Sequence, residues 1–336
     1  MLAPQGPQPG REAAWRAQTG APPAQIGGSR LSGILVVNAG STSLKLALVD
    51  ESGRAEAVGS LDDLPAGIDA VGHRIVHGGR VFRDPVRIDD GVVSELEALK
   101  PLAPLHQAPA LEALALARGK APDVPHVAVF DTAFHATLTE AASTYAVPRA
   151  WREQWGVRRF GFHGIAVESV AEQVDARRLV VCHLGGGCSV TAVLDGRSVD
   201  TTMGFTPLDG VPMATRSGAI DPGVLLYALH ERGLTPDELD EALERRSGLE
   251  ALGGLDADLG FAVFVYRVAQ AIAAMAVALG GVDVVAFSGG IGENREDVRD
   301  AVLGLLGPLG EPRVEVVPAR EDLVIARAVR HLLSAP

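Results

Sequence analysis

The stretch ILVVNAGSTSLKLALVD, residues 34–50, decides how the fold is interpreted. Its first part is a near-continuous apolar run that is typical of a buried β-strand, and a second apolar run returns from Leu44. The polar residues between the two runs predict a tight turn, as in an ordinary hairpin. A turn made of glycine and hydroxyl residues also offers backbone N–H groups and short donors to an anion, which is how loops hold phosphate. Both interpretations are open for this stretch alone.

The same pattern occurs a second time in LVVCHLGGGCSVTAVLD, residues 179–195. At an offset of 145 residues throughout, Asn38 aligns with His183 and Asp50 aligns with Asp195. This offset is about the length of one domain, so the repeat predicts an internal duplication. Two such turns on opposite sides of a cleft would grip one polyphosphate. The sequence contains no G-x-x-x-x-G-K-[ST] motif, which excludes a P-loop NTPase.

Length and composition agree with a globular protein of about two domains. The chain has 336 residues, of which 47% are apolar and 21% are charged. The net charge of −12 argues against a general nucleic-acid or anionic-membrane binder, because such a protein needs a basic face. A local basic site for a phosphorylated ligand is compatible with this charge.

Three further segments bear on location and metal binding. Residues 1–30 are rich in Pro, Gly, Ala and Gln and lack the apolar run of a signal peptide, so they predict a disordered extension. Residues 268–281 are too short to span a bilayer and predict a buried helix. Cys182 and Cys188, with His183 between them, allow a zinc site as an alternative, although zinc usually takes four ligands in closely spaced pairs. So few cysteines suit a reducing cytoplasm.

The other apolar patterns predict alternating strands and helices, which is typical of an α/β fold. A proline-punctuated loop is expected at residues 101–109. The strand at 124–130 runs directly into Asp131, and the carboxyl ends of parallel strands are where open α/β sheets bind ligands. A strand at 282–287 ends in a glycine turn at 288–294, before a helix N-terminus that would face phosphate. We expect further strands at 54–61, 70–76 and 313–317, an ordered loop at 201–223, and helices at 90–99, 111–118, 166–174, 223–232, 236–246, 258–280 and 321–333.

Ten ordered motifs between about residues 33 and 327 resemble those of acetate kinases. They read NAGSTSLK, HRIVHGG, PLAPLH, FDTAFH, RRFGFHG, HLGGG, MGFTPLDG, TRSGAIDPG, SGGIGEN and PAREDLVIA. Acetate kinases form the acetokinase branch of the actin, heat-shock chaperone and sugar-kinase superfamily. The resemblance implies two duplicated RNase H-like domains with the actin-like ATPase fold and the nucleotide in the cleft between them. The first domain would comprise residues 31–150 with the C-terminal helix 323–336, and the second residues 151–322.

The activity implied by this resemblance is the reversible transfer of phosphate from ATP to acetate, which gives ADP and acetyl phosphate. Mg²⁺ is the implied metal, with Mn²⁺ as a substitute. Family members are homodimers, so a cytoplasmic homodimer without nucleic-acid or membrane partners is expected. Phosphoryl transfer depends mainly on alignment and on neutralising the charge of the moving group.

The resemblance also assigns roles to individual residues. Arg74 and Arg216 match the arginines that hold the carboxylate and the phosphoryl group, and a planar fork of donors suits both groups. His163 matches the histidine that bonds the transferring phosphoryl, and Asp131 matches the aspartate that orients an arginine. Asn38 and Glu321 match the residues associated with Mg²⁺, which needs few protein oxygens beside the phosphates. The residues that match the acetate pocket are Val76, Leu105, Phe162 and Pro207. Those that match the ATP site are Ser41, Thr42, Ser43, Lys45, His183, Gly185, Gly186, Gly187, Gly289, Gly290, Ile291, Gly292, Glu293 and Asn294. His106 matches a supporting histidine.

The sequence departs from the family pattern in several places. Gly186 stands where the second turn usually has Asn, so an amide contact to phosphate is lost. The chain is also shorter than the family's usual length, with one gap after Leu249 in a stretch near the dimer contact. Two alternatives stay open: a kinase for propionate or another short-chain acid, and a nucleotide-binding member that no longer catalyses. The presence of Arg74, Asp131, His163 and Arg216 together favours a catalyst.

Overall fold

The computed structural model describes residues 33–334 apart from 41–43, 63, 66 and 103, and only the backbone of residues 104–106. The extension expected at residues 1–30 lies outside the described part of the chain, as do the first-turn residues Ser41, Thr42 and Ser43. The side chains of Leu105 and His106 lie outside it too.

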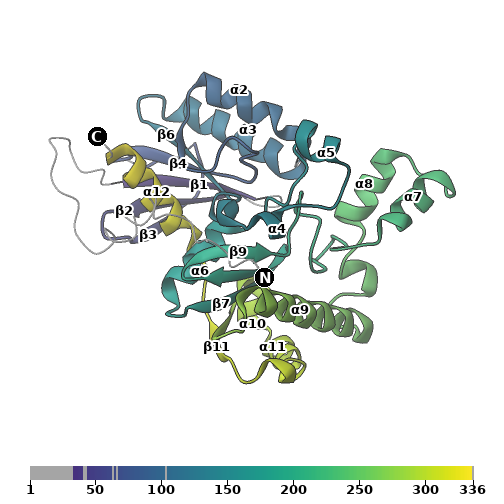
Figure 1. Cartoon of the computed structure of the whole chain (residues 1–336). Helices are drawn as coiled ribbons and strands as arrows, with labels where there is room; N and C mark the ends of the chain where they lie inside the picture. Colours follow the sequence, from purple (N-terminus) through teal and green to yellow (C-terminus); the bar gives the residue numbers. More distant parts are fainter. Residues whose placement is uncertain (1–32, 41–43, 63, 66, 103, 335–336) are drawn as a thin grey trace, which may run out of the picture. The chain divides into compact units, whose positions relative to one another are not determined.

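The first sheet has the strand order β3-β2-β1-β4-β6-β5, and Figure 1 labels these strands except β5. Strand β1 pairs antiparallel with β2, and β2 pairs antiparallel with β3. On its other edge, β1 pairs parallel with β4, and β4 pairs parallel with β6. The short strand β5 lies antiparallel to β6. The bounds are β1 Gly33–Ala39, β2 Leu44–Asp50, β3 Ala55–Val58, β4 Ala70–Ile75, β5 Val86–Arg87 and β6 His126–Phe130.

The second sheet repeats this topology in the order β9-β8-β7-β10-β11. Strands β7, β8 and β9 form an antiparallel meander, and β10 and β11 follow in parallel on the other edge of β7. The second sheet therefore matches the first strand by strand, without an equivalent of β5. The bounds are β7 Arg178–Leu184, β8 Cys188–Leu194, β9 Arg197–Thr201, β10 Val284–Ser288 and β11 Arg313–Val316.

The predicted constant offset between the two hairpins is wrong after the turn. Strands β1 and β7 are related by the expected 145 residues. However, Asp50 pairs with Gly33 in the first hairpin, and Leu194 pairs with Arg178 in the second. Asp50 is therefore equivalent to Leu194 and not to Asp195. The reason is turn length: four residues separate β1 from β2, and three separate β7 from β8.

Two helices cover opposite faces of the first sheet. Successive residues of a strand point to opposite faces. Val71 packs in one core cluster with Leu111 and Leu114 of α3 (Pro104–Lys120), beside α2 (Asp90–Ala98). The next residue, Gly72, faces α12 (Glu321–Ser334), where a β-carbon on Gly72 would come within 2.8 Å of Val329. Helix α12 thus covers the second face of the first sheet.

The second sheet is covered in the same way. The α9 side chains Phe264 and Ile272 pack with Val180 of β7, and α11 joins that cluster. Val181 faces the other way and packs with α6. By length and composition α9 is the one helix of the described chain that is apolar enough to cross a membrane, yet half of that apolar stretch is buried against the sheet. The bounds are α6 Gly164–Gln173, α9 Asp258–Leu279 and α11 Glu296–Gly304.

The loop expected at residues 101–109 is wrong, because α3 begins at Pro104 and a 3-10 turn, Lys100–Leu102, precedes it. Proline is tolerated in the first turn of a helix, where the N–H groups have no intrahelical partner. Pro109 does remove one interior bond, but Ala110 and Leu111 are buried directly after it and anchor the helix in the core.

The glycine turn expected at residues 288–294 is instead a short helix, α10 (Gly289–Asn294). Its own side chains close the helical turn. Glu293 accepts a hydrogen bond from the backbone N–H of Gly289 (2.9 Å), and Asn294 donates one to the carbonyl oxygen of Gly290 (2.9 Å). These bonds compensate for the low helix propensity of four residues that include three glycines.

Several shorter elements lie outside the two sheets. The segment between β9 and α7 has no regular structure, yet Met203, Val211 and Met213 are buried in it, as expected of an ordered loop. The short helices are α4 Glu140–Ser143, α5 Arg149–Gln154, α7 Pro222–His230 and α8 Pro236–Arg245, with 3-10 turns at Phe134–Thr137, Glu250–Leu252 and Gly307–Leu309.

Candidate active site

A buried ion pair lies where two neighbouring strands of the first sheet end. Strands β4 and β6 run parallel, which places Arg74 and Asp131 side by side at their carboxyl ends. Arg74 donates from Nε (3.0 Å) and Nη2 (2.5 Å) to Oδ2 of Asp131. The side chains are only 14% and 1% exposed. Burial alone would lower the pKa of Arg74, but the carboxylates of Asp131 and Glu321 raise it, so the guanidinium stays charged.

Asn38 and Glu321 extend this pair into a hydrogen-bonded chain. Asn38 accepts from Nη1 of Arg74 (3.1 Å) and donates to Glu321 (2.6 Å), the first residue of α12. Burial raises the pKa of Glu321, but the charges of Arg74 and His183 and the hydrogen bond from Asn38 lower it. The pKa is therefore below its ordinary value. Glu321 is therefore an anion at neutral pH, at a helix N-terminus that also favours negative charge.

His163 is held in an uncommon backbone conformation between the two sheets. It has a left-handed φ of 61° and caps α6. Its Nδ1 lies 3.1 Å from the hydroxyl of Ser189, and its ring meets that of His183 edge-on, with centroids 4.9 Å apart. The following residue, Gly164, donates its N–H to the carbonyl oxygen of Asp131 (2.8 Å). The histidine is thus fixed to the strand end that carries the ion pair.

Arg216 lies near His163 at the second glycine turn, which is formed by residues 185–187 between β7 and β8. A β-carbon added to Gly187 would lie 2.9 Å from Nε2 of His163 and 3.7 Å from Nη2 of Arg216. Both side chains therefore lie against the backbone of Gly187. Arg216 is buried, donates to the carbonyl oxygen of Pro207 (3.2 Å), and faces Glu244 of α8 at 3.7 Å. Burial lowers the pKa of Arg216, and Glu244 opposes this shift.

The second glycine turn also contacts α10. A β-carbon on Gly185 would lie 3.6 Å from the backbone nitrogen of Gly290, whereas one on Gly186 would meet nothing within 4 Å. The carbonyl oxygen of Gly186 accepts from the N–H of Ala214, two residues before Arg216. Three Gly-rich motifs that are far apart in the sequence thus meet at one place.

The residues expected to form an apolar pocket are buried near this site. Val76 and Phe162 belong to one core cluster, and Phe162 is packed against the edge of the His77 ring, with centroids 5.3 Å apart. Pro207 is buried, and its carbonyl oxygen binds Arg216. The side chain of Leu105 is outside the described part, so three of the four positions are placed.

Two buried polar atoms of the site have no hydrogen-bond partner among the described residues, Oδ1 of Asp131 and Nδ1 of His183. Such atoms are costly unless something binds them, so they point to a polar ligand. No group of three or more His, Cys, Asp or Glu side chains that could hold a metal lies in the part of the chain that the structure describes. Cys182 and Cys188 are free and buried, and burial raises the pKa of Cys188 to about 12.

Sequence reasoning missed three residues that position the site. Ser189 orients His163, Glu244 faces Arg216, and Gly164 permits the close approach to Asp131. Ser189 and Gly164 are adjacent to recognised motifs, which is a usable signal. Glu244 lies in the acidic helix PDELDEALER, where it is indistinguishable from its solvent-exposed neighbours. Lys45 is exposed on β2, directly opposite Asn38 in the hairpin register.

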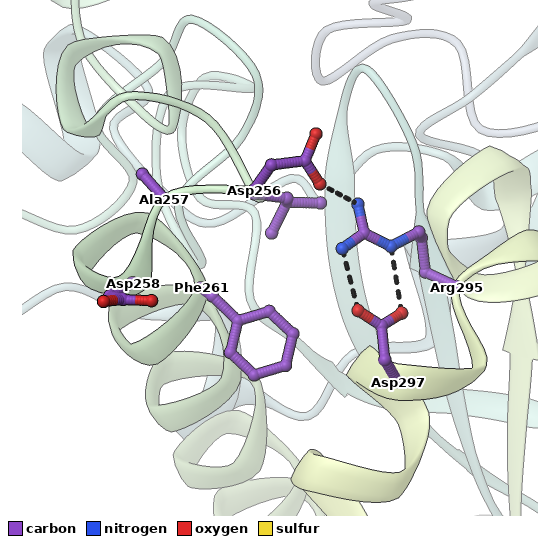
Figure 2. Close-up of a pocket in the computed structure, with 7 residues that line it drawn as sticks. Asp256, Ala257, Asp258, Phe261, Arg295 and Asp297 are labelled. Carbon is purple, nitrogen blue, oxygen red and sulfur yellow. Dashed lines mark hydrogen bonds and ion pairs between the residues drawn. The ribbon is translucent and has the colours of Figure 1, made fainter.

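A pocket opens just beyond α10. It has a volume of about 380 Å³, and Figure 2 shows Asp256, Asp258, Phe261, Arg295 and Asp297 around it. Arg295 is fixed in the wall, because Asp297 accepts two bonds from it (2.9 and 2.8 Å) and Asp256 accepts a third (3.1 Å). Leu255 and Ala257 complete the lining.

Residues 55–324 match the model of the acetokinase family. The chain belongs to the acetokinase family. This acetokinase is therefore a phosphotransferase with a carboxyl group as acceptor. The family uses ATP and generally Mg²⁺.

Similar proteins agree with this assignment. An acetate kinase of Synechococcus sp. is 43% identical over 321 residues, which cover 82% of this chain and 79% of that protein. An acetate kinase of Deinococcus deserti is 39% identical over 391 aligned positions, covering 90% and 98%. That alignment is longer than this chain, so it includes gaps here, as expected of a shortened acetokinase.

Solved structures confirm the predicted fold class. A propionate kinase from Francisella tularensis superimposes with a TM-score of 0.82 at 31% identity, covering 88% of this chain and 98% of that one. An acetate kinase from Porphyromonas gingivalis gives 0.76 at 29% identity, covering 90% and 100%. The two sheets of equal topology are the duplicated halves of the actin-like ATPase fold.

Proposed function

We propose that this acetokinase catalyses the reversible transfer of the γ-phosphoryl group of ATP to acetate. The observation that carries the proposal is the convergence of His163 and Arg216 on the backbone of Gly187. Two hydrogen-bonding side chains and a glycine turn at one point form a site for a phosphoryl group that carries negative charge.

The reaction needs no base. An acetate oxygen attacks the γ-phosphorus and forms a new P–O bond, while the bond to the β,γ-bridging oxygen breaks and ADP leaves with its electron pair. The carboxylate is already ionised at neutral pH, so no proton has to be removed. In our proposal Arg74 and Arg216 hold the acid and the transferring group, His163 and His183 bond phosphate oxygens, and Asp131 orients Arg74 through the two bonds described above.

Asn38 and Glu321 would hold an Mg²⁺ ion, because their side chains carry the oxygen ligands that this metal prefers. Glu321 is an anionic oxygen ligand, and Oδ1 of Asp131 is a buried carboxylate oxygen without a partner among the described residues. The ion, when bound, supplies positive charge that neutralises the polyphosphate.

We place the nucleotide along the second glycine turn and α10, with Lys45 on the other side of the phosphates. The pocket in Figure 2 begins at Arg295, one residue after α10, so it lies where the nucleoside would extend. Phe261 supplies an apolar wall, and the carboxylates of Asp256 and Asp258 are acceptors for amino and hydroxyl groups.

The acid would bind in the apolar pocket of Val76, Phe162, Pro207 and Leu105. Phe162 and Val76 are almost fully buried in the core, so a site beside them has room for only a small acid. One additional methylene group costs roughly 1–3 kcal/mol in such a pocket, so propionate is expected as a weaker substrate. Propionate kinase is the second candidate function, and the similarity to the Francisella tularensis protein favours keeping it.

A hydroxamate assay tests the proposal. Purified protein is incubated with ATP, Mg²⁺, hydroxylamine and either acetate, propionate or butyrate. The strongest colour with acetate supports the proposed substrate, and the strongest colour with propionate supports the second candidate. No colour with any acid, while ATP still binds, would favour a non-catalytic member.

The variant Arg216→Ala should reduce kcat by about 10²–10³-fold, because it removes charge stabilisation in the transition state.

A cytoplasmic homodimer is part of the same proposal, because ATP is a cytoplasmic co-substrate and one helix exposes an unusual apolar surface. Helix α7 has the sequence PGVLLYALH and no buried residue. Its Leu226 and Tyr227 are 59% and 55% exposed, and Tyr266 of α9 is 55% exposed. Contiguous exposed apolar patches are typical of protein–protein contacts. Light scattering of Leu226→Asp should report monomers where the unchanged protein gives dimers.

A further inference from the structure

A second cluster of positive charge lies outside the proposed catalytic residues. Arg80 and Arg83 are in the segment between β4 and β5, and Arg158 follows α5. All three line one pocket, whose other lining residues are Thr132, Phe160, Gly79, Phe82, His135 and Ala136. None of the residues assigned above to acid, nucleotide or metal lines it.

These three arginines have no carboxylate partner within the part of the chain that the structure describes. Arg158 donates from Nε to the carbonyl oxygen of Arg159 (3.2 Å), which leaves most of its donors unused. The charges that act on it are those of Arg83 and Arg80: burial, followed by these two arginines, lowers the pKa of Arg158. By contrast, the adjacent Arg159 faces Asp209 at 3.5 Å.

An unpaired cluster of this kind is unexpected in a protein with 42 acidic and 30 basic residues. Like charges at close range repel one another and destabilise the folded state. A bound anion would remove this repulsion, whereas no carboxylate among the described residues pairs with these arginines, although Asp84 follows Arg83 in the sequence.

The pocket is built by specific packing. Gly156 has a left-handed φ of 71°, and a β-carbon on it would come 3.0 Å from Cδ of Arg80, so the stem of Arg80 lies against this glycine. The guanidinium of Arg158 lies over the ring of Phe160, 6.0 Å from its centroid. Phe82 stacks on Phe130 with centroids 5.1 Å apart, which anchors the segment between Arg80 and Arg83.

We propose that Arg80, Arg83 and Arg158 bind the phosphate group of a ligand at a site separate from the catalytic one. A guanidinium presents a planar fork that matches two phosphate oxygens, and three forks suit a dianion. The enclosed part of the pocket is only about 20 Å³, room for one water. The phosphate therefore lies at the mouth, where the exposed side chains of Arg80 and Arg83 close on it. Free inorganic phosphate and a phosphate monoester share this chemistry.

Equilibrium dialysis of the full-length protein with radiolabelled inorganic phosphate tests the site. The wild type should show saturable binding that weakens as NaCl is raised. The double variant Arg80→Gln/Arg83→Gln should lose at least about tenfold in affinity for one site per chain, since charge-assisted hydrogen bonds are the strong ones. Arg87→Gln is the matched control, because Arg87 is an exposed arginine of the neighbouring β5 that does not line the pocket, and it should bind as the wild type does.

Further variants and a competition experiment distinguish this site from the catalytic site and identify the ligand. Arg216→Ala, which impairs the proposed catalytic site, should retain this binding, so a failure of the proposed function leaves the test intact. Arg80→Lys/Arg83→Lys keeps the charge without the fork and should bind more weakly than wild type but more tightly than the Gln variant. Competition by glycerol 3-phosphate distinguishes the sources: competition at lower concentration than unlabelled phosphate assigns the site to a phosphate monoester, and weaker competition assigns it to free phosphate. Equal binding by wild type and the folded Gln double variant would overturn the proposal.

Discussion

The substitution Gly164→Ala tests the geometry that joins the two halves of the site. Gly164 follows His163 and donates its N–H to the carbonyl oxygen of Asp131 (2.8 Å). A β-carbon at this position would lie 2.2 Å from that oxygen and 3.2 Å from the carbonyl carbon. Both are backbone atoms, so no side-chain rotation relieves the overlap.

The required displacement sets the expected effect. Ordinary contact begins at about 3.4 Å, so the backbone at Gly164 must move away from Asp131 by about 1 Å. His163 moves with it, because it is the adjacent residue. A misplacement of about 1 Å costs roughly 10²-fold in rate when catalysis depends on alignment, and overpacking costs about 1–3 kcal/mol of stability. We therefore expect kcat to fall about 100-fold and the free energy of unfolding to fall by about 1–3 kcal/mol.

Initial rates in the hydroxamate assay at saturating ATP and acetate give kcat, and urea unfolding gives stability. Gly119→Ala is the control, because a β-carbon there meets nothing within 4 Å and Gly119 lies in α3. This control should keep its kcat and gain up to about 1 kcal/mol of stability. A folded Gly164→Ala protein with kcat within threefold of wild type would refute the argument that His163 is positioned through Asp131.

Three further outcomes are expected. Gly186→Asn should fold normally, because the position is open, and should lower the KM for ATP about fivefold by restoring a hydrogen bond worth about 1 kcal/mol; an unchanged KM contradicts this. Glu244→Gln removes the charge that faces Arg216 at 3.7 Å and should lower kcat/KM for the acid about tenfold in steady-state kinetics, whereas unchanged kinetics would show that Glu244 does not orient this arginine. Burial lowers the pKa of His77 and His135 to about 4, below the unfolded value of 6.5, so the unfolded chain binds more protons between these values. Their contribution is complete above pH 6.5 and should fall by about 3 kcal/mol each as pH drops toward 4; urea midpoints that stay constant from pH 7.5 to 5 would contradict it.

The duplicated sheets could be predicted because their information is local. The apolar runs around Asn38 and His183 specify buried strands, and turn residues specify hairpins without any knowledge of the rest of the chain. The length of the turn between β7 and β8 was harder to predict from the sequence. The two hairpins can be aligned with or without a one-residue gap in this glycine turn, and apolar residues face apolar residues at several positions in both alignments. Helix α3 was missed at its start because Pro104 and Pro109 dominate local propensity, whereas the burial of Leu111 decides the structure.

Likewise, only some contacts of the candidate site could be predicted from the sequence. Arg74 and Asp131 could be placed together from the sequence, since both follow strands that end at one edge of a parallel sheet. The contact of Arg216 with Glu244 could not, because it depends on how α8 folds back onto a long irregular loop. Nothing in the local pattern of an acidic helix distinguishes the one carboxylate that turns inward. Similarly, the arginine pocket depends on Arg158 meeting a segment that lies more than 70 residues earlier in the chain.

The position of α12 determines when the protein can fold during its synthesis. Ile325 and Val329 lie against Gly72, and Glu321 accepts a hydrogen bond from Asn38, so one face of the first sheet is covered by a helix that is synthesised long after its strands. At 5–20 residues per second, translation from the end of β4 to the end of α12 takes on the order of 10–50 s. Throughout that interval one apolar face of the first sheet has no cover from its own chain. Exposed apolar surface of this kind makes a nascent chain prone to aggregation, and a stop codon before residue 321 would remove both the cover of the first sheet and Glu321 at once.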